Sequence, residues 1–377
     1  MLRNLKKIFG RNYEPLNKID ISLSNLKHNY KYLSSIDKRI KVAPVLKSNA
    51  YGHGIELVAK ALDKFNPPFF CVDSLYEAYK LLKTGIKTPI LIMGYVDPKS
   101  LKTKKIPFSF AVYDYGVILT LNRYQPQAKI HIFVDTGMHR EGVRIDELPK
   151  FLHSIISKTN LEIEGIMSHF AESENSKNPS TKEQVQNFQK AILILKKSGI
   201  NPKWIHIANS SAILNNKLYK ARLGNMVRTG IALYGIDTEG KDKNLKPALT
   251  LKTSISQIKN LHKTEKAGYN FTFTAKENMQ IAILPIGYYD GVDRRLSNKG
   301  FTLVNGGYCP IIGRVSMNIT IIDVSKIANV KIGQEVIIYS NNPENKNSIQ
   351  KAAKLCNELP YVLLGNLASS TKRLALT

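Results

Sequence analysis

Short, nearly continuous apolar runs alternate with amphipathic stretches through the first two-thirds of the chain. The runs predict eight strands, at residues 41–47, 69–74, 88–94, 109–114, 129–137, 162–170, 204–212 and 226–235. Strands that are apolar on both faces are typical of a parallel sheet covered on both sides. Eight of them alternating with helices predict an α/β fold that begins with a (β/α)8 TIM-type barrel.

Amphipathic helices are predicted between many of these strands. The clearest spans residues 179–197, where Ser180 begins a capping-box pattern and apolar residues then recur on one face. Residues 54–65 and 74–85 have the same periodicity. Residues 95–108 lack it, so no helix is predicted there.

The pattern changes after about residue 240, beyond a charged connector that ends in proline. Alternating strands bounded by turn residues follow at 251–261, 279–287, 309–324 and 333–340, with one helix at 347–359. This pattern indicates a mostly-β second domain. We therefore expect a basic lead-in at residues 1–15, a barrel at 16–240 and a C-terminal β domain at 241–377.

The composition is that of a globular protein with a strongly basic balance. Apolar residues make up 43% of the 377 residues, and the formal net charge is +26. Basic proteins often bind phosphate backbones. Here the lysines are scattered along the whole chain, and their densest clusters lack interleaved aromatic residues. The charge is therefore expected to serve solubility, and no nucleic-acid partner is predicted.

Cysteine usage and the absence of long apolar runs predict a cytoplasmic protein. Cys71, Cys309 and Cys356 are odd in number and widely spaced, which argues against a disulfide framework. No apolar stretch approaches the roughly 20 residues that cross a bilayer. The basic opening of the chain also lacks the apolar core and cleavage pattern of a secretory signal.

Chemically capable residues gather where the predicted barrel strands end, which is where barrel enzymes place their active sites. They are Lys47 and Tyr51, Arg140, His169, Asn209 and Ser210, and Arg228 and Gly230. The set suits an anionic ligand, with a lysine as amine nucleophile or base. Each residue alone has an ordinary explanation, such as a solvated loop lysine, a core histidine or a helix cap. The strand count therefore locates a site without identifying its chemistry.

Sequence motifs supply that chemistry through a resemblance. "VLKSNAYGHG" (45–54) closely resembles the pyridoxal 5'-phosphate (PLP) lysine motif of bacterial alanine racemases. Other signatures of this family follow in order at 134–143, 165–174, 206–212, 227–235, 284–295, 311–318 and 359–365. The resemblance covers nearly the whole chain from about residue 17. It implies a PLP-bearing barrel and a β domain, a homodimer with shared active sites, and racemisation of alanine that supplies D-alanine for peptidoglycan.

The resemblance also implies roles for individual residues. Lys47 would bind the PLP aldehyde and act as a base on one face of the substrate, and Tyr269 of the partner chain would act on the other. Arg140 and Met317 would meet the substrate carboxylate, and no metal is expected. The implied cofactor contacts are Lys47, Tyr51, Arg140, His169, Asn209, Ser210, Arg228, Gly230, Ile231 and Tyr361.

Several positions depart from the family pattern. Phe133 stands where many members have a lysine that supports the residue matching Arg140. Ser316 and Asn318 replace a cysteine and an aspartate beside Met317, and Thr229 replaces a proline before Gly230. The loop around Tyr269 also differs, with Asn270 in place of glycine. None of these changes removes a group that performs the chemistry.

Three alternatives remain open on the sequence. The substrate could be serine, lysine or several amino acids, because the residues near the substrate carboxylate differ. The chain could also be a PLP-holding barrel without racemase activity, although such small proteins lack the β domain that carries Tyr269 and Met317. Binding to nucleic acid would rest on charge alone.

Overall fold

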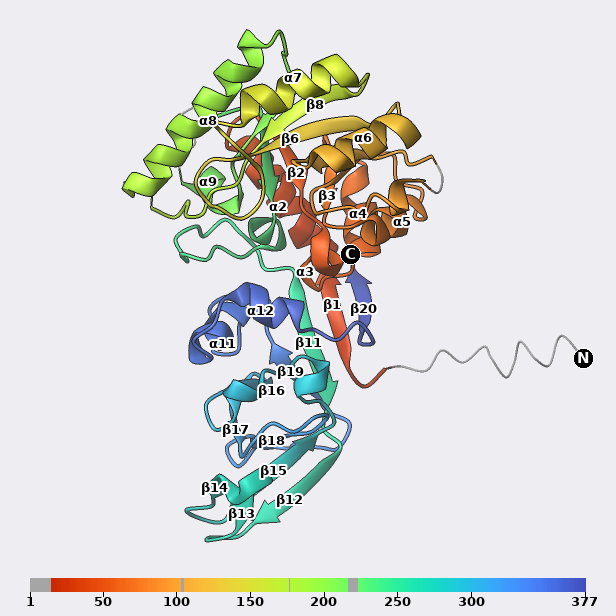
Figure 1. Cartoon of the computed structure of the whole chain (residues 1–377). Coiled ribbons are helices and arrows are strands. Elements are labelled where there is room, and N and C mark those ends of the chain that lie inside the picture. The colour runs from red at the N-terminus through yellow and green to blue at the C-terminus, as the bar shows by residue number, and fades with distance from the viewer. Residues whose placement is uncertain (1–14, 103–104, 176, 216–222) are drawn as a thin grey trace, which may run out of the picture. The chain divides into compact units, whose positions relative to one another are not determined.

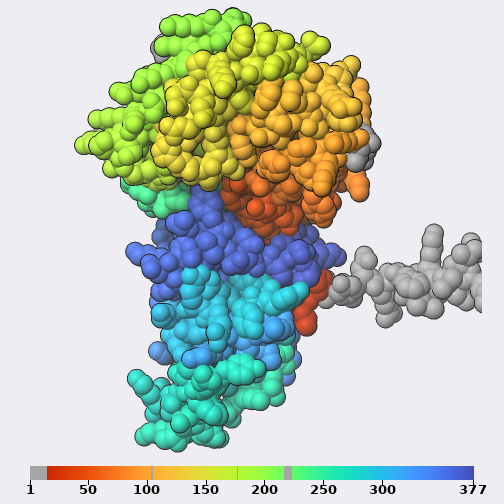
Figure 2. Space-filling view, viewed as in Figure 1, coloured from red at the N-terminus to blue at the C-terminus, as the bar shows by residue number. Residues whose placement is uncertain are grey.

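The computed structural model describes residues 15–102, 105–175, 177–215 and 223–377. Its contacts divide the chain into two compact units. One comprises the described residues up to Ser22 together with Leu249–Leu376, and the other comprises Leu23–Ala248. Figure 1 traces both units from red at the N-terminus to blue at the C-terminus, and Figure 2 shows them with their side chains. The predicted lead-in at 1–15 lies, apart from Pro15, outside the described residues.

The unit Leu23–Ala248 contains a ring of eight parallel strands, as predicted. They are β2 (Lys41–Pro44), β3 (Phe70–Val72), β4 (Ile90–Ile92), β5 (Ser109–Val112), β6 (Lys129–Asp135), β8 (Glu162–Met167), β9 (Trp204–His206) and β10 (Met226–Thr229). Strands β3 to β9 pair in this order, and β10 pairs with β2. A bridge between Val45 and Cys71 joins β2 to β3, and the Arg228 N–H donates to Ala208 O beside β9. The predicted α/β barrel is confirmed.

One helix precedes β2, others follow most of these strands, and they lie around the strands in Figure 1. They are α2 (Leu23–Ser35), α4 (Ile55–Asp63), α5 (Leu75–Leu82), α6 (Tyr115–Tyr124), α7 (Leu148–Lys158), α8 (Pro179–Lys197) and α9 (Ser210–Leu214). Helix α8 has the predicted bounds, but the prediction that Ser180 caps it is wrong. Asn178 is the cap, because its side chain accepts from the Ser180 N–H and Pro179 begins the helix.

The segment after β2 adopts an unusual backbone. In α3 (Lys47–Tyr51) the four residues Ser48–Tyr51 all have φ between +52° and +56°. The turn is therefore left-handed, although none of its residues is glycine. Side-chain hydrogen bonds hold it: Asn49 Oδ1 accepts from the Ile55 N–H at 3.0 Å, and Glu77 Oε1 lies 3.4 Å from the Asn49 N–H. The chain thus reverses directly after Lys47.

The other unit is mostly β, as predicted. Its nine-stranded sheet has the order β12-β15-β18-β17-β16-β19-β11-β1-β20. The strands are β1 (Lys18–Ser22), β11 (Leu249–Ser254), β12 (Gln257–Leu261), β15 (Met279–Leu284), β16 (Phe301–Val304), β17 (Gly307–Ile312), β18 (Thr320–Asp323), β19 (Glu335–Tyr339) and β20 (Lys372–Leu376). A small hairpin, β13 (Lys266–Ala267) with β14 (Phe273–Thr274), and helices α11 (Ile349–Leu355) and α12 (Pro360–Gly365) complete it.

Strand β1 shows where the unit boundaries depart from the predicted domains. The sequence pattern placed residues 16–240 in the barrel, yet β1 pairs antiparallel with β11 and parallel with β20. Lys252 of β11 forms ion pairs with Asp20 at 2.9 Å and with Glu335 at 3.0 Å. The connector up to Ala248 belongs with the barrel, since the Ala248 N–H donates to Tyr234 O at 3.1 Å. Among the described residues no helix is long and apolar enough to cross a membrane.

Candidate active site

Arg228 on β10 is the centre of the polar residues at the carboxyl ends of the barrel strands. It is only 4% exposed. Its Nη1 donates to His206 Nδ1 at 2.7 Å and to His206 O at 3.1 Å. Its Nη2 donates to Ser168 O at 2.6 Å and to His169 Nδ1 at 3.1 Å. Four acceptors therefore fix the plane of the guanidinium.

His169 is neutral in this environment. Burial lowers its pKa to about 3, and the positive charges of Arg228, Arg140 and Lys47 add to the effect. Because arginine only donates, the nitrogen that faces Arg228 is the acceptor, and the proton of the neutral ring lies on Nε2. Burial, together with the charge of Arg140, also lowers the pKa of Arg228 to about 10, which leaves it charged at neutral pH. The mouth of the barrel is thus cationic and suits an anion.

Lys47 stands at this mouth with its amine partly exposed. Its Nζ lies 3.5 Å from Asp73 Oδ1, on the loop after β3. The charge of Lys47 is one of those that act on His169, so the predicted lysine and histidine belong to one electrostatic environment. The amine is accessible for chemistry and has a carboxylate beside it.

Tyr51, Ser210 and Gly230 form a small cradle. Ser210 Oγ accepts from the N–H groups of Gly230 at 3.0 Å and Ala232 at 3.3 Å. A Cβ at position 230 would lie 2.4 Å from Tyr51 Oη, so any side chain there would force the tyrosine to move. Ile231, between these two N–H groups, is buried.

Thr229, which directly precedes Gly230, supplies a further hydroxyl group. Its buried Oγ1 has no hydrogen-bond partner among the described residues. Hydroxyl groups and backbone N–H groups gathered in this way suit a phosphate. Together with the donors of Arg228, the cradle fits the phosphate and the ring nitrogen of PLP.

The side chains of Asn209 and Arg140 form hydrogen bonds with other groups of the chain. Asn209 caps α9, because its Oδ1 accepts from the Ala212 N–H at 2.9 Å and from Ser173 Oγ at 2.8 Å. Arg140 Nε donates to Glu141 Oε2 at 3.0 Å. Sequence reasoning missed Glu141, which adjoins the arginine and supplies it with a carboxylate.

Phe133, at the position where the family often has lysine, lies in an apolar environment. It is buried and clusters with Ala111 and Met167, and its ring meets Tyr113 edge-on at 6.0 Å. No charged group at this position reaches Arg140. The carboxylate that pairs with Arg140 is instead that of its neighbour Glu141.

Three predicted site residues, Tyr269, Met317 and Tyr361, lie in the C-terminal unit. Tyr269 begins the 3₁₀ turn η3 (Tyr269–Phe271) in the β13–β14 hairpin and is 67% exposed. Met317 is 55% exposed, and its carbonyl accepts from the Tyr289 N–H at 2.9 Å. Tyr361 lies in the first turn of α12.

Two departures from the family pattern have local explanations in this unit. Asn270 has φ +59°, so the hairpin adopts the left-handed conformation with asparagine where the family commonly has glycine. Asn318 Nδ2 donates to Asp290 Oδ2 at 3.2 Å, a bond that an aspartate could not make in its ionised form.

Comparison with known proteins settles the family. A model of the N-terminal domain of alanine racemase matches residues 21–238, and a model of its C-terminal domain matches residues 248–375. The chain belongs to the alanine racemase family. The alanine racemase of Borreliella burgdorferi (strain ZS7) is 36% identical over 367 residues, which cover 94% of this chain and 96% of that protein.

Solved alanine racemases share the fold. The enzyme from Bacillus anthracis with bound L-Ala-P has a TM-score of 0.88 and 28% identity over 97% of this chain and 96% of its own. The enzyme from Bartonella henselae with covalently bound pyridoxal phosphate has a TM-score of 0.83 and 26% identity over 96% and 100%. The predicted membership, barrel architecture and racemase class are confirmed, and the alanine racemase family is PLP-dependent.

Proposed function

We propose that this chain interconverts L- and D-alanine with bound PLP, using Lys47 and Tyr269 as its two bases. The observation that carries the proposal is the convergence of Lys47, His169 and Arg228 at one end of the barrel. Bound PLP would supply an electron-withdrawing ring that makes the Cα proton of the attached substrate acidic. The remaining requirements, which are holding this ring and moving the proton, fall to residues of the chain.

Arg228 would hold the ring nitrogen without protonating it. The guanidinium is charged at neutral pH, and it has donors but no acceptor. It therefore donates a hydrogen bond and keeps its proton. A ring nitrogen that stays unprotonated withdraws electrons less strongly, which disfavours transamination as a side reaction. The hydroxyls of Tyr51, Ser210 and Tyr361 and the backbone N–H groups of Gly230 and Ile231 would hold the phosphate.

Lys47 and Tyr269 would exchange the Cα proton from opposite faces. The Lys47 amine would hold the cofactor and, when free, would remove or return a proton at one face of the substrate. Tyr269 of a second copy of the chain would do so at the other face. Arg140 and the Met317 N–H would bind the substrate carboxylate, which a charged guanidinium suits.

The C-terminal unit supports a dimer with shared sites. Large apolar side chains that are more than 40% exposed lie on the segments that carry the predicted residues: Tyr269, Phe271, Tyr288, Tyr289, Met317 and Ile319. Backbone bonds from Tyr288 to Ser316 and from Tyr289 to Met317 hold two of these segments together. Exposed aromatic and methionine side chains in such numbers are typical of protein interfaces. We infer a homodimer in which this surface meets the partner.

Exchange of the Cα proton in D₂O tests the proposal. Purified, PLP-loaded protein is incubated with L-alanine, and NMR and a chiral assay follow deuterium uptake and D-alanine. Both are expected. Exchange with serine or lysine but not alanine would indicate a racemase of different specificity, which the changed residues Ser316 and Asn318 leave open. No exchange with any amino acid would contradict the proposal and indicate a PLP carrier. Supply of D-alanine to peptidoglycan and a cytoplasmic location remain part of the proposal.

A further inference from the structure

A row of buried polar side chains crosses the barrel from Arg228 to the opposite end of the strands. Arg228 Nη1 bonds to His206 Nδ1 at 2.7 Å, and His206 Nε2 lies 2.8 Å from His131 Nδ1. His131 Nε2 then lies 3.4 Å from Glu164 Oε2. Both histidines are fully buried. The four residues come from β10, β9, β6 and β8, so the row spans strands distant in sequence.

Only one arrangement of protons satisfies this row. Arginine has donors alone, so His206 Nδ1 must accept and its proton must lie on Nε2. That proton is donated to His131 Nδ1, which places the His131 proton on Nε2, facing a carboxylate that only accepts when ionised. Burial lowers the pKa of His131 and, with the charge of Arg228, that of His206, which keeps both rings neutral. Every hydrogen bond in the row therefore points from Arg228 toward Glu164.

Glu164 terminates the row at the amino-terminal ends of the strands. It is 7% exposed, accepts from Ser109 Oγ at 2.9 Å and lies 3.5 Å from Lys129 Nζ. Burial alone would raise the pKa of Glu164. The bonds from His131 and Ser109 and the charge of Lys129 outweigh this effect, so the pKa is lowered below its ordinary value and the carboxyl is ionised.

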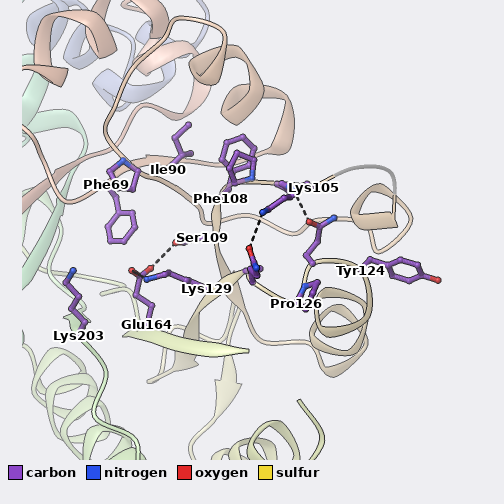
Figure 3. A pocket seen from close by; sticks show the side chains of 16 residues that line it. Phe69, Ile90, Lys105, Phe108, Ser109, Tyr124, Pro126, Lys129, Glu164 and Lys203 are labelled. Atoms are coloured by element: carbon purple, nitrogen blue, oxygen red, sulfur yellow. Dashed lines mark hydrogen bonds and ion pairs between the residues drawn. The ribbon is translucent and has the colours of Figure 1, made fainter. Parts of the chain in front are cut away.

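Glu164 also meets solvent-accessible space. Together with Ser109, Lys129 and Lys203 it lines a cavity of about 730 Å³ at this end of the barrel (Figure 3). The two lysines contribute positive charge to the cavity lining. The anion at the end of the row is therefore balanced by charges that lie outside the barrel interior.

Gly165 shows that the backbone makes room for this row. A Cβ at position 165 would lie 2.3 Å from His131 Nδ1, and the clash would be with the ring itself. A residue with a side chain would therefore displace the ring that links His206 to Glu164. The glycine lies between Glu164 and the rest of β8, so one strand supplies both the anion and the space.

We propose that Glu164 is a positioning residue that anchors the far end of this hydrogen-bond row: by accepting from His131 it reinforces the direction that Arg228 sets, so that His206 keeps an unprotonated nitrogen toward Arg228 and holds the guanidinium in place. This inference rests on the proposed function, because that function requires Arg228 to hold the ring nitrogen of the cofactor. A buried carboxylate at the far end makes each nitrogen along the row a better acceptor. Its effect reaches the active site without any contact between Glu164 and the cofactor or substrate.

Nitrogen NMR of the chain labelled with ¹⁵N-histidine tests the row directly, without activity. Two-bond couplings distinguish the two nitrogens of each ring, and His131→Gln and His206→Gln assign the signals. Both rings are expected in one neutral form with the proton on Nε2. A proton on Nδ1, or a charged ring, in either residue at neutral pH would overturn the proposal.

Three variants separate positioning from folding. Glu164→Leu removes the acceptor, Glu164→Gln keeps an acceptor without charge, and Glu162→Gln removes the other carboxylate that pairs with Lys129 but does not contact His131. The Leu variant is expected to show a second set of His131 and His206 signals, and the Gln variant a smaller population of it. Glu162→Gln is expected to match the parent. If Leu fails to fold, Gln alone decides the outcome.

Kinetics of the PLP-loaded enzyme give the second readout. By analogy with partners that orient metal-ligating histidines, Glu164→Leu is expected to lower kcat roughly 10-fold with KM little changed. Transamination should rise relative to racemisation. Histidine signals and a transamination ratio both unchanged in Glu164→Leu would overturn the proposal. A parent enzyme that does not racemise any amino acid would instead refute the proposed function, and the NMR result would still decide the direction of the row.

Discussion

The barrel unit and the C-terminal unit contribute to the proposed site in opposite ways. At the barrel mouth the key side chain, Arg228, is buried and bonded to four acceptors. In the C-terminal unit Tyr269 and Met317 are more than half exposed, on short loops. Preorganised polar groups need a surrounding core, and a group that serves a partner must stay on the surface. In the proposed site, the barrel unit supplies most of the cofactor contacts from buried side chains, whereas the C-terminal unit adds Tyr361 and presents Tyr269 and Met317 at its surface for a partner chain.

Removing the lysine of the barrel mouth is expected to have the largest effect. Lys47→Ala deletes both the amine proposed to bind PLP and one proposed base, so kcat in both directions should fall at least about 1,000-fold. Racemisation rates and the absorbance of bound PLP measure this. Lys60→Ala, on an exposed face of α4, is the control. More than a tenth of the parent rate in Lys47→Ala would exclude the assigned role.

Removing the exposed tyrosine tests whether the C-terminal unit acts on a partner. Tyr269→Phe should lower racemisation roughly 100-fold or more, while exchange of the Cα proton persists for the enantiomer that Lys47 deprotonates. Tyr76→Phe, on the exposed face of α5, should leave the rate unchanged.

Co-expression sharpens this test. Mixed dimers of Lys47→Ala and Tyr269→Phe chains contain one intact site if the sites are shared, so about one quarter of the parent activity should return with random pairing. Activity no higher than that of the two variants alone would contradict sharing between subunits.

The cradle predicts a smaller effect on cofactor affinity. Gly230→Ala places a Cβ 2.4 Å from Tyr51 Oη, so the tyrosine must move and the Kd for PLP should rise about 10-fold. Fluorescence titration of the cofactor-free protein measures it. Gly365→Ala is the matched control, since a Cβ there has no atom within 4 Å and the backbone is ordinary. Equal affinities in the two variants would show that the cradle does not bind the phosphate.

The buried histidines predict a modest effect of pH on stability. Their pKa values are lowered in the folded chain, to about 3 for His169, so below pH 6.5 the unfolded chain binds more protons. Stability should therefore fall as the pH drops from 6.5 to 5.5, by up to about 1.4 kcal/mol per pH unit for each histidine. Urea unfolding measures this above the range where carboxylates titrate. His169→Gln should reduce the slope, whereas the exposed His153→Gln should not.

Local patterns predicted much of the fold, because the decisive interactions were local. All eight barrel strands and helix α8 follow from apolar runs and periodicity. Strand β1 did not, since its partner β11 lies more than 220 residues away in sequence. The cap of α8 was missed because Asn178 and Ser180 are both good capping residues, and only the backbone decides between them.

The residues of the candidate site likewise fall into those that the sequence predicted and those that it did not. Motifs named Lys47, His169 and Arg228, which the structure brings together. They did not reveal His206, His131 or Glu164, although each is a polar residue within an apolar strand, a pattern that could have indicated a buried network. Glu141 escaped because an acidic residue beside an exposed arginine is common on any surface.

The left-handed turn Ser48–Tyr51 has a thermodynamic consequence for the whole chain. Each L-residue with a side chain in this conformation costs roughly 1–2 kcal/mol, so four in succession cost about 4–8 kcal/mol. This sum is of the same order as the net stability of a typical domain, about 5–15 kcal/mol. A chain selected for stability alone would carry glycine here. The segment directly after Lys47, the proposed catalytic lysine, is therefore a strained part of the fold, sustained by the packing of the barrel around it.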